Sequence, residues 1–377
     1  MERRVKGQGP SRRIALNGRF SGVTEPSGTQ IAAFHLFDRI IRRNREFELV
    51  VFADLRFPGV AAWRDCPGTV VHPVPFRDWA PARAHLWEQL ALPLLCARHH
   101  CPVAHHPITT SPWWRHRCKT IVTLHDLNFY RHPEWYSPAF RALYACCALP
   151  GLRRADHIAA ISDYVRTQAH EFLGIPEGRL HRIYNGVKPP VPSGNPPPPG
   201  RYVFCVGSLP PHKNLVRMIE AFLQVRDEFP GLELRMAGRP HPRLGREDSR
   251  LPALLSAPGV RQLGYLSEAD LARAYAEAEV FCYPSLEEGF GLPVLEAMSA
   301  GAPVVTSDCS CLPEIAGPSA ILVDPHSVEA IAAGLRQALR LSPAERQASG
   351  DAGRAWAARF TWEEAADRYL TLYGNLF

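Results

Sequence analysis

The sequence predicts an α/β protein with two parallel-sheet domains, and three observations support this. Short apolar runs typical of buried strands alternate with segments whose apolar residues repeat at helical spacing, which favours parallel strands joined by crossover helices. The alternation starts again at Tyr202. Between the two series, residues 188–200 are rich in proline and lack apolar periodicity, as in a semi-rigid linker. We therefore expect domains at 1–187 and 201–360 and a final helix in 361–377.

The totals are those of a globular protein. The chain has 377 residues, of which 46% are hydrophobic and 21% are charged, enough for two or three domains with sizeable cores. No apolar run reaches the ~18 residues that a membrane-spanning helix needs, and no signal-peptide core follows the basic N-terminus. We therefore expect a cytoplasmic protein. The ten cysteines form no Cys-x-x-Cys framework, which favours reduced thiols.

In the first domain, strands are expected at 13–17, 48–52, 120–124 and 155–162, and an amphipathic helix at 31–45. Residues 1–11 are polar and basic, and we expect them to be disordered. A helix that contains Trp87-Glu88-Gln89 should be kinked or broken at Pro93. His125 and Asp126 directly follow a buried strand, where open α/β sheets bind ligands. A lone histidine is nevertheless more often structural than functional.

In the second domain, strands are expected at 202–206, 232–238, 260–266, 278–283, 303–307 and 320–324, and helices at 215–226, 268–279, 327–341, 343–360 and 362–373. Ser162 and Ser267 are expected to cap the helices that follow them. Lys213 precedes the helix at 215–226, and a lysine beside a helix N-terminus suits a diphosphate. An exposed lysine without a ligand is an equally good interpretation.

The stretch around Glu288 carries the clearest functional pattern. Gly289 and Gly291 let the backbone turn tightly and approach a ligand, and a helix is expected at 293–301. Glu288 would then lie in a loop and Glu296 about one turn inside the helix, on either side of an anion-binding helix N-terminus. Such a site suits a nucleotide sugar, although an ordinary strand–loop–helix with a capping glutamate has the same local pattern.

Charge is spread unevenly over the net value of +6. Residues 1–188 hold 26 Lys and Arg against 15 Asp and Glu, and the remainder holds 17 against 22. A basic first half suggests an anionic acceptor or an anionic membrane surface, and a merely solvated surface is the alternative.

A metal centre is not expected. One stretch holds the candidate ligands Cys96, His99, His100, Cys101, His105 and His106. These residues straddle a helix end, a proline and a probable strand, which disfavours a shared ion. The sequence also has no Asp-x-Asp, the acidic motif that could bridge a metal and a phosphate.

The string from Glu288 to Glu296 encloses Gly-Phe-Gly-Leu-Pro and is followed by Ala-Met-x-Ala-Gly-x-Pro-Val-Val. It closely resembles the signature of the retaining family 4 glycosyltransferases. Gly18-Arg19-Phe20, the Ser-Gly-Thr-Gln of residues 27–30 and the segment around His125 also resemble this family. The resemblance implies the GT-B arrangement of two facing Rossmann-like, doubly wound domains with an interdomain cleft, and a last helix that crosses back to the first domain.

The resemblance also implies roles for single residues. The implied catalytic residues are His125, Glu288 and Lys213, and Asp126 would orient His125 or face the acceptor. The implied donor-binding residues are Gly28, Ser208, Lys213, Asn214, Gly264, Tyr265, Leu266, Glu288, Gly289, Phe290, Gly291, Leu292 and Glu296.

In these implied roles Glu288 binds the hydroxyls of the sugar and Glu296 binds the ribose, and neither is a nucleophile. Lys213, the Gly28 N–H and the helix N-terminus near Gly291 would meet the charge of the departing diphosphate, so that no metal or cofactor is expected. The sequence departs from the family pattern at three positions where many relatives have Arg, namely Ile31, Ser208 and His212.

The motifs at 18–20, 87–89 and 206–209 look most like those of bacterial mannosyl- or rhamnosyltransferases of surface polysaccharide assembly, including lipopolysaccharide. The resemblance thus favours GDP-mannose as donor and a glycan or lipid-linked acceptor, with a possible peripheral contact to an anionic membrane and no nucleic-acid partner. The open alternatives are a UDP-glucose-type or rhamnose donor, a pyridoxal-phosphate-dependent phosphorylase, a nucleotide-sugar epimerase or hydrolase, and a non-enzymatic nucleotide- or nucleic-acid-binding module.

Overall fold

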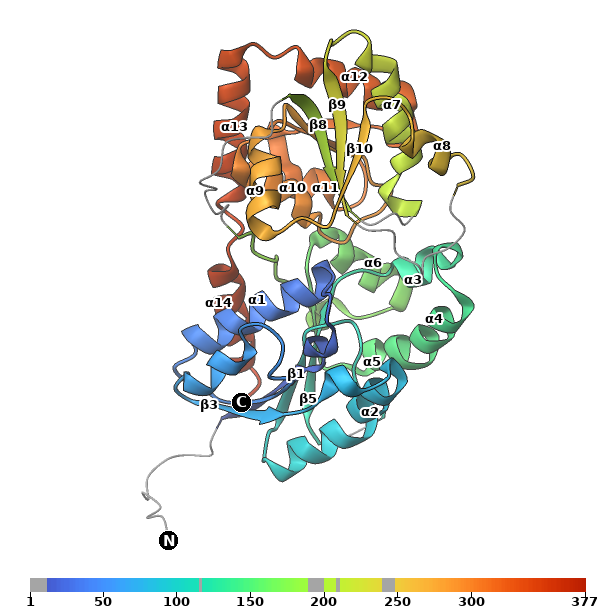
Figure 1. Ribbon diagram of the computed structural model, residues 1–377. Coiled ribbons are helices and arrows are strands. Elements are labelled where there is room, and N and C mark those ends of the chain that lie inside the picture. Colours follow the sequence, from blue (N-terminus) through green and yellow to red (C-terminus); the bar gives the residue numbers. More distant parts are fainter. Residues whose placement is uncertain (1–11, 115–116, 189–199, 208–210, 239–247) are drawn as a thin grey trace.

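The computed structural model describes residues 12–114, 117–188, 200–207, 211–238 and 248–377. They form two α/β units, one above the other in Figure 1. The expectations for residues 1–11, for most of the linker and for Ser208 lie outside the described residues.

Each unit is built on one parallel sheet. The first sheet has the strand order β3-β2-β1-β4-β5-β6-β7 and the second has the order β10-β9-β8-β11-β12-β13. The first comprises β1 (Arg13–Gly18), β2 (Glu48–Ala53), β3 (Thr69–Pro73), β4 (Val103–His106), β5 (Lys119–Leu124), β6 (His157–Ala160) and β7 (Leu180–Arg182). The second comprises β8 (Arg201–Val206), β9 (Leu232–Ala237), β10 (Val260–Gly264), β11 (Val280–Tyr283), β12 (Val304–Ser307) and β13 (Ile321–Val323). The predicted α/β fold with two parallel sheets is confirmed.

Strand order reverses once in each sheet. In the first sheet β1 lies between β2 and β4, and in the second β8 lies between β9 and β11. The connections on the two sides of such a strand run in opposite directions, which leaves a crevice beyond the strands' carboxyl ends. The residues that follow β1, β4, β8 and β11 are therefore the best placed to form a site.

Helices cover both faces of the sheets. They are α1 (Gly28–Arg43), α2 (Pro81–Arg98), α3 (Asn128–Arg131), α4 (Pro138–Leu143), α5 (Leu149–Arg154), α6 (Asp163–Leu173), α7 (Leu215–Arg226), α8 (Leu251–Leu255), α9 (Glu268–Glu277), α10 (Leu292–Ala300), α11 (Leu312–Ala316), α12 (Val328–Leu339), α13 (Pro343–Ala357) and α14 (Trp362–Gly374). Ser162 and Ser267 accept hydrogen bonds from the first turns of α6 and α9, which confirms both predicted caps.

Some boundaries differ from the predictions for local reasons. Helix α1 begins at Gly28 rather than at Ile31, because Ser27 and Gln30 form a capping box ahead of the apolar periodicity. Helix α2 continues through Pro93, so the proline does not end it. The short strands β3 and β7 and the helices α3 to α5 were not predicted, since elements of three to six residues show little periodicity.

The last helix packs on the first unit. Figure 1 shows α14 beside α1, below the second sheet. Tyr369 and Tyr373 of α14 are buried there, and their hydroxyls contact Thr123 Oγ1 at 2.6 Å and the ring of His105. Lys119 Nζ donates to the backbone oxygen of Leu376 at 2.8 Å. Helix α14 therefore contributes to the core of the first unit.

The two units also share a buried hydrophobic cluster. It includes Leu124 and Ile161 of the first unit and Phe290 and Leu312 of the second. Backbone N–H groups at the start of α6 donate across the boundary to the carboxylate of Glu314, from Asp163 at 2.8 Å. These contacts hold the carboxyl ends of the two sheets toward each other.

Candidate active site

The centre of the candidate site is a three-residue cluster at the reversal point of the second sheet. Tyr283 ends β11, Lys213 ends the 3-10 turn Pro211–Lys213 after β8, and Glu288 lies in the loop after β11. Lys213 Nζ donates to Glu288 Oε1 at 2.7 Å and also to the Tyr283 hydroxyl. The Tyr283 hydroxyl donates to the same carboxylate oxygen at 2.9 Å. The predicted pair Lys213 and Glu288 is thus in direct contact.

Both members of this pair carry charge. Burial acts to raise the pKa of Glu288, but the Lys213 ammonium, together with His212 and Ser285, outweighs burial and lowers that pKa. Burial acts to lower the pKa of Lys213, but the Glu288 carboxylate and the Tyr283 hydroxyl together outweigh burial and raise that pKa. The side chains are only 15% and 13% exposed. The ammonium and the carboxylate are therefore in contact where little solvent reaches them. Their electrostatic interaction is stronger there than in bulk water because the local dielectric constant is lower.

Asn214 fixes the lysine turn to the glutamate loop. Its backbone is left-handed, with φ of 57°, and it is the N-cap residue of α7. Its buried side-chain amide donates to the carbonyl oxygens of Pro284 at 2.9 Å and Pro325 at 2.6 Å. The Leu286 N–H donates to the His212 oxygen at 2.7 Å. The sequence predicts that Asn214 binds the donor. In the structure its side chain joins the turn that carries Lys213 to the loops at Pro284 and Pro325.

Gly289 brings this loop against the first domain. A Cβ atom at Gly289 would lie 1.8 Å from the backbone oxygen of His125, so only glycine permits this approach. Ser162 Oγ donates to the Gly289 oxygen at 2.7 Å. Gly291, which precedes α10, has a φ of 85°. The glycines of the Glu-x7-Glu string thus allow both the turn and the close contact between domains.

His125 is buried and has a defined tautomer. Its Nε2 lies 2.8 Å from the Pro107 carbonyl oxygen, which can only accept, so Nε2 carries the hydrogen. Burial lowers the pKa of His125, so the ring is neutral and Nδ1 is a hydrogen-bond acceptor. The group that orients His125 is therefore the Pro107 carbonyl rather than Asp126.

Asp126 lies across from the Lys213–Glu288 pair. Its Oδ1 accepts the Asn128 N–H at 3.0 Å. The pKa of Asp126 is raised to about 6, chiefly by burial. The Glu288 and Glu287 carboxylates add to this rise in pKa, while the Asn128 N–H and Lys213 oppose it. The carboxyl groups of the two domains are thus close enough to influence one another, and Asp126 titrates near neutral pH.

Glu287 links the domains and was not predicted. This carboxylate is 5% exposed, and its Oε1 accepts from Arg131 at 2.8 Å, from Gln168 at 3.0 Å and from the Tyr164 hydroxyl. All three donors belong to the first unit. The one sequence feature that could have indicated a role for Glu287 is its position next to Glu288. Sequence alone does not show which of these two adjacent side chains points toward the first domain.

The other predicted donor-binding residues are spread over several elements of both units. Glu296 is on α10 and accepts the Tyr275 hydroxyl at 2.8 Å, and burial raises its pKa. Gly28 is exposed at the first turn of α1. Gly264 ends β10 and Tyr265 is 70% exposed. The remaining predicted residues are buried or half-buried and include Leu266, Phe290 and Leu292.

A second polar cluster lies at the reversal point of the first sheet. Glu88 of α2 is fully buried, and it accepts hydrogen bonds from Asn17 Nδ2 at 2.6 Å and Thr110 Oγ1 at 2.7 Å. The Nε atom of Arg19 lies 3.4 Å from it and Nδ1 of His106 lies 3.3 Å from it. Burial acts to raise the pKa of Glu88, but Arg19, His106 and His85 together outweigh burial and hold the pKa at about 2. We call these residues the Glu88 cluster.

The candidate metal ligands between Cys96 and His106 do not converge on one point. His106 faces the Glu88 cluster, whereas His105 contacts Thr123 and Tyr373 in the core. Neighbouring residues of one strand face opposite sides of the sheet, which keeps the two histidines apart. Among the described residues no group of three or more Cys, His, Asp or Glu side chains has the geometry to hold a metal ion.

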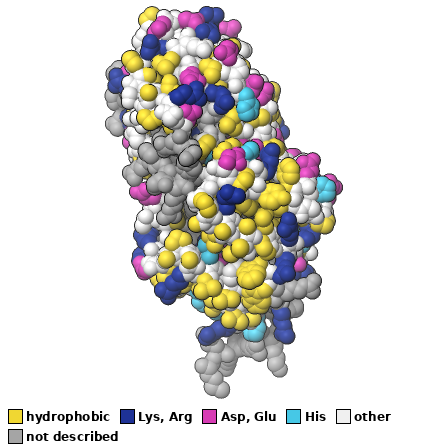
Figure 2. All heavy atoms as spheres, turned by 90° about the vertical axis from the view of Figure 1, so that its right-hand side faces the viewer, with side chains coloured by type: hydrophobic (Ala, Val, Ile, Leu, Met, Phe, Trp, Pro, Cys, Tyr) yellow, Lys and Arg dark blue, Asp and Glu magenta, His cyan; other side chains and the backbone are white. Residues whose placement is uncertain are grey.

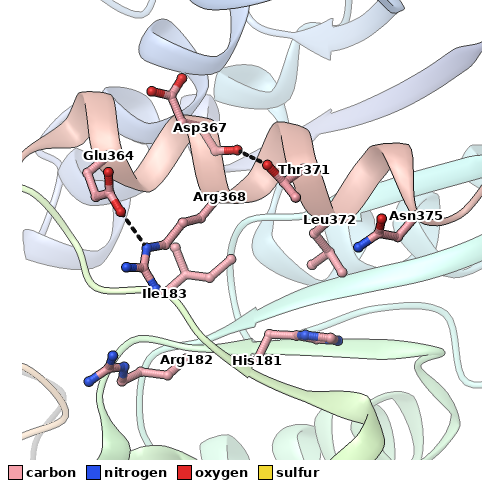
Figure 3. A pocket seen from close by; sticks show the side chains of 9 residues that line it. All are labelled: His181, Arg182, Ile183, Glu364, Asp367, Arg368, Thr371, Leu372 and Asn375. Carbon is pink, nitrogen blue, oxygen red and sulfur yellow. Dashed lines mark hydrogen bonds and ion pairs between the residues drawn. The ribbon is translucent and has the colours of Figure 1, made fainter.

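Two cavities lie away from these clusters. One of about 360 Å³ lies between β7 and α14 and is lined by polar side chains such as His181, Arg182 and Arg368 (Figure 3). The other, of about 440 Å³, adjoins it near Tyr184, Asn185 and Phe360. Neither is lined by a residue predicted to bind a donor.

Two family models match the chain. The model described as Glycosyltransferase Family 4 matches residues 26–189, and the model described as Glycosyl transferases group 1 matches residues 192–356. The O-antigen chain mannosyltransferase B of Escherichia coli is 31% identical over 275 residues, which are 68% of this chain and 70% of that protein.

Two further relatives are mannosyltransferases by name. The MMP alpha-(1->4)-mannosyltransferase of Mycolicibacterium hassiacum is 31% identical over 71% of this chain and 63% of that protein. A serotype-specific mannosyltransferase of Escherichia coli is 29% identical over 69% of this chain, and this match spans 33% of that longer protein.

Solved structures share the fold at low identity. Sucrose-phosphate synthase from Thermosynechococcus elongatus superposes with a TM-score of 0.73 at 20% identity, covering 97% of this chain and 99% of that one. Anabaena HepE in complex with UDP-glucose superposes with a TM-score of 0.71 at 17% identity, covering 96% and 99%. The matches over both halves, and the relative that is 31% identical, show that this chain belongs to the family 4 glycosyltransferases and has their GT-B fold.

Proposed function

We propose that this glycosyltransferase moves mannose from GDP-mannose to a glycan or lipid-linked acceptor in surface polysaccharide synthesis, in the cytoplasm and with retention of anomeric configuration. Three relatives named as mannosyltransferases support the choice of sugar, and one of them is named for the O-antigen chain. The observation that carries the proposal is the charged Lys213–Glu288 pair facing His125 and Asp126 across the domain contact.

Lys213 would receive the diphosphate of the donor. Without a ligand its charge is neutralised by Glu288 at 2.7 Å. An arriving diphosphate would compete for the ammonium and release the carboxylate oxygens of Glu288, which could then accept hydrogen bonds from the sugar hydroxyls. Gly28 at the start of α1 and Gly291 at the start of α10 would add backbone N–H donors. Glu296 would accept from the ribose.

The first domain would supply the acceptor side. The free Nδ1 of His125 can accept a hydrogen bond from a hydroxyl of the transferred sugar, and Asp126 would face the acceptor hydroxyl. The acceptor oxygen forms its bond to the anomeric carbon on the face from which the diphosphate oxygen departs, and its proton leaves with the diphosphate. Glu288 and Glu296 remain non-covalent partners, and fixed positive groups stabilise the departing charge.

A donor panel tests this proposal. The purified protein is incubated with GDP-mannose, UDP-glucose or a rhamnose nucleotide and a lipid-linked acceptor, and the product is identified by NMR. We expect an α-mannoside from GDP-mannose and release of GDP. A β-mannoside would contradict retention, consumption of donor without acceptor would indicate a hydrolase, and a changed donor sugar would indicate an epimerase. Glu288→Gln should abolish transfer, whereas Glu268→Gln, at an exposed ion pair, should retain it.

A further inference from the structure

Helix α2 carries an apolar stripe on its outer face. Leu86, Leu90 and Leu94 recur every four residues and are 58%, 51% and 67% exposed. Residues at this spacing lie on one face of a helix, while the opposite face of α2, with Glu88 and Leu92, is buried. A solvated helix normally presents polar side chains on its outer face, and this one presents leucine.

Two exposed tryptophans lie in a loop that contacts α2. Trp113 is 47% exposed and Trp114 is 36% exposed. Their loop is fixed to α2, since the Trp113 N–H donates to Gln89 Oε1 at 3.0 Å and the Trp114 indole donates to the Gln89 oxygen. Arg154 of α5 donates to the Trp113 oxygen from the other side. The tryptophan loop is thus fixed to Gln89 of α2, the residue that precedes Leu90 of the leucine stripe.

The surroundings of this stripe are basic. The charged residues of α2 are Arg83, Glu88 and Arg98, and Glu88 is buried. Arg154, which contacts the tryptophan loop, adds a further positive charge. Arg83 and Arg98 are exposed near the two ends of the leucine stripe. Figure 2 shows hydrophobic side chains gathered over this side of the lower unit, with Lys and Arg around them.

We propose that this face of the first domain, which we call the α2 face, docks on an anionic lipid surface. Leucine side chains can enter the boundary between headgroups and acyl chains, tryptophan rings suit the headgroup level, and arginines can reach lipid phosphates. Two copies joined through the α2 face would set like charges against each other, which disfavours self-association. Among the described residues no helix is long and apolar enough to cross a bilayer, so the contact is peripheral.

Docking through the α2 face would fix the orientation of the enzyme relative to the membrane. Asp126, on the proposed acceptor side, belongs to the same domain as α2, so docking through α2 would hold the acceptor side of the cleft near lipid-linked molecules. The inference does not depend on which sugar is transferred, and transfer to a water-soluble acceptor should be independent of it.

Vesicle flotation tests the inference with the full-length protein. We expect the wild type to float with phosphatidylglycerol-containing vesicles, and much less with phosphatidylcholine alone. Leu90→Ser with Leu94→Ser should weaken partitioning on the order of tenfold, since two leucines no longer leave water. Leu263→Ser with Leu322→Ser is the matched control on the second sheet, where both leucines are exposed, and it should float like the wild type.

Charge and alternative partners are tested in parallel. Arg83→Gln with Arg98→Gln should weaken binding to anionic vesicles about tenfold or more and leave binding to neutral vesicles unchanged. Flotation that survives the leucine changes, or that is equal for neutral and anionic vesicles, would overturn the inference. A dimer in solution that the leucine changes abolish, without vesicle binding, would assign the α2 face to a second copy instead. Sugar transfer to a soluble acceptor is measured for every variant. Activity without vesicle binding would contradict the membrane inference alone, whereas no activity even in the wild type would contradict the proposed function.

Discussion

Glu88 offers the sharpest test of the packing in the first domain. The Glu88→Ala change removes a carboxylate that is fully buried and accepts from Asn17 and Thr110 while it neutralises Arg19, whose side chain is only 11% exposed. An unpaired buried charge would remain, and Asn17 and Thr110 would each lose a carboxylate acceptor. Breaking a buried ion pair in this way costs about 3–5 kcal/mol.

This loss should appear as a large shift in thermal unfolding. For a domain of this size about 2–4 °C of Tm is lost for each kcal/mol, so the transition of the first domain should fall by about 6–20 °C. The matched control is Glu48→Gln, which removes a pair with Arg13 that is 2.8 Å long but about one-third exposed. Exposed pairs contribute about 0–1 kcal/mol, so the control should shift little. Equal shifts in the two variants would refute the reasoning.

The pH dependence gives an independent check on Glu88. Its folded-state pKa of about 2 lies below the ordinary value for a glutamate, so its contribution to stability is full above that ordinary value. The contribution is lost as the pH falls from about 4.5 toward 2, where the folded carboxylate takes up its proton. Glu88→Gln should therefore flatten the acid limb of unfolding free energy measured by urea titration, and an unchanged limb would contradict the assigned pKa.

Three further predictions concern the cleft. Glu288→Ala should lower kcat/KM for transfer about 100-fold or more with an unchanged circular dichroism spectrum, and wild-type turnover by the folded variant would exclude its role. Gly289→Ala places a Cβ against the His125 oxygen, so it should lower both Tm and activity, whereas Gly178→Ala, in open space, should change neither. Because the pKa of Asp126 is raised to about 6, transfer should decline as the pH falls through 6, and Asp126→Asn should remove that limb of the pH–rate profile.

The fold was largely predictable because its signals are local. Buried strands such as 120–124 and amphipathic helices such as α7 carry periodicity that a single sequence displays, and the caps at Ser162 and Ser267 follow from side-chain chemistry. The contact of Lys213 with Glu288 was also within reach, because both follow strands that meet at one edge of a parallel sheet.

What sequence reasoning missed depends on tertiary partners. Glu287 accepts from donors that lie more than one hundred residues away in the chain. The buried charge of Glu88 is stabilised by Arg19, Asn17, Thr110 and His106, none of which is near it in the sequence. Pairings at such separations leave no periodic trace in one sequence. The orientation of His125 by the Pro107 carbonyl is of the same kind, since a backbone acceptor has no sequence signature.

Donor binding to the Lys213 cluster is the most direct test of the account. Calorimetry should give a Kd for GDP-mannose that weakens about 10- to 100-fold in Lys213→Ala, since a charged hydrogen bond to the diphosphate is lost. Lys188→Ala, which removes an exposed lysine paired with Glu268, should leave the Kd unchanged. If folded Lys213→Ala binds the nucleotide sugar as tightly as the wild type does, the donor does not occupy this cleft and the account is wrong.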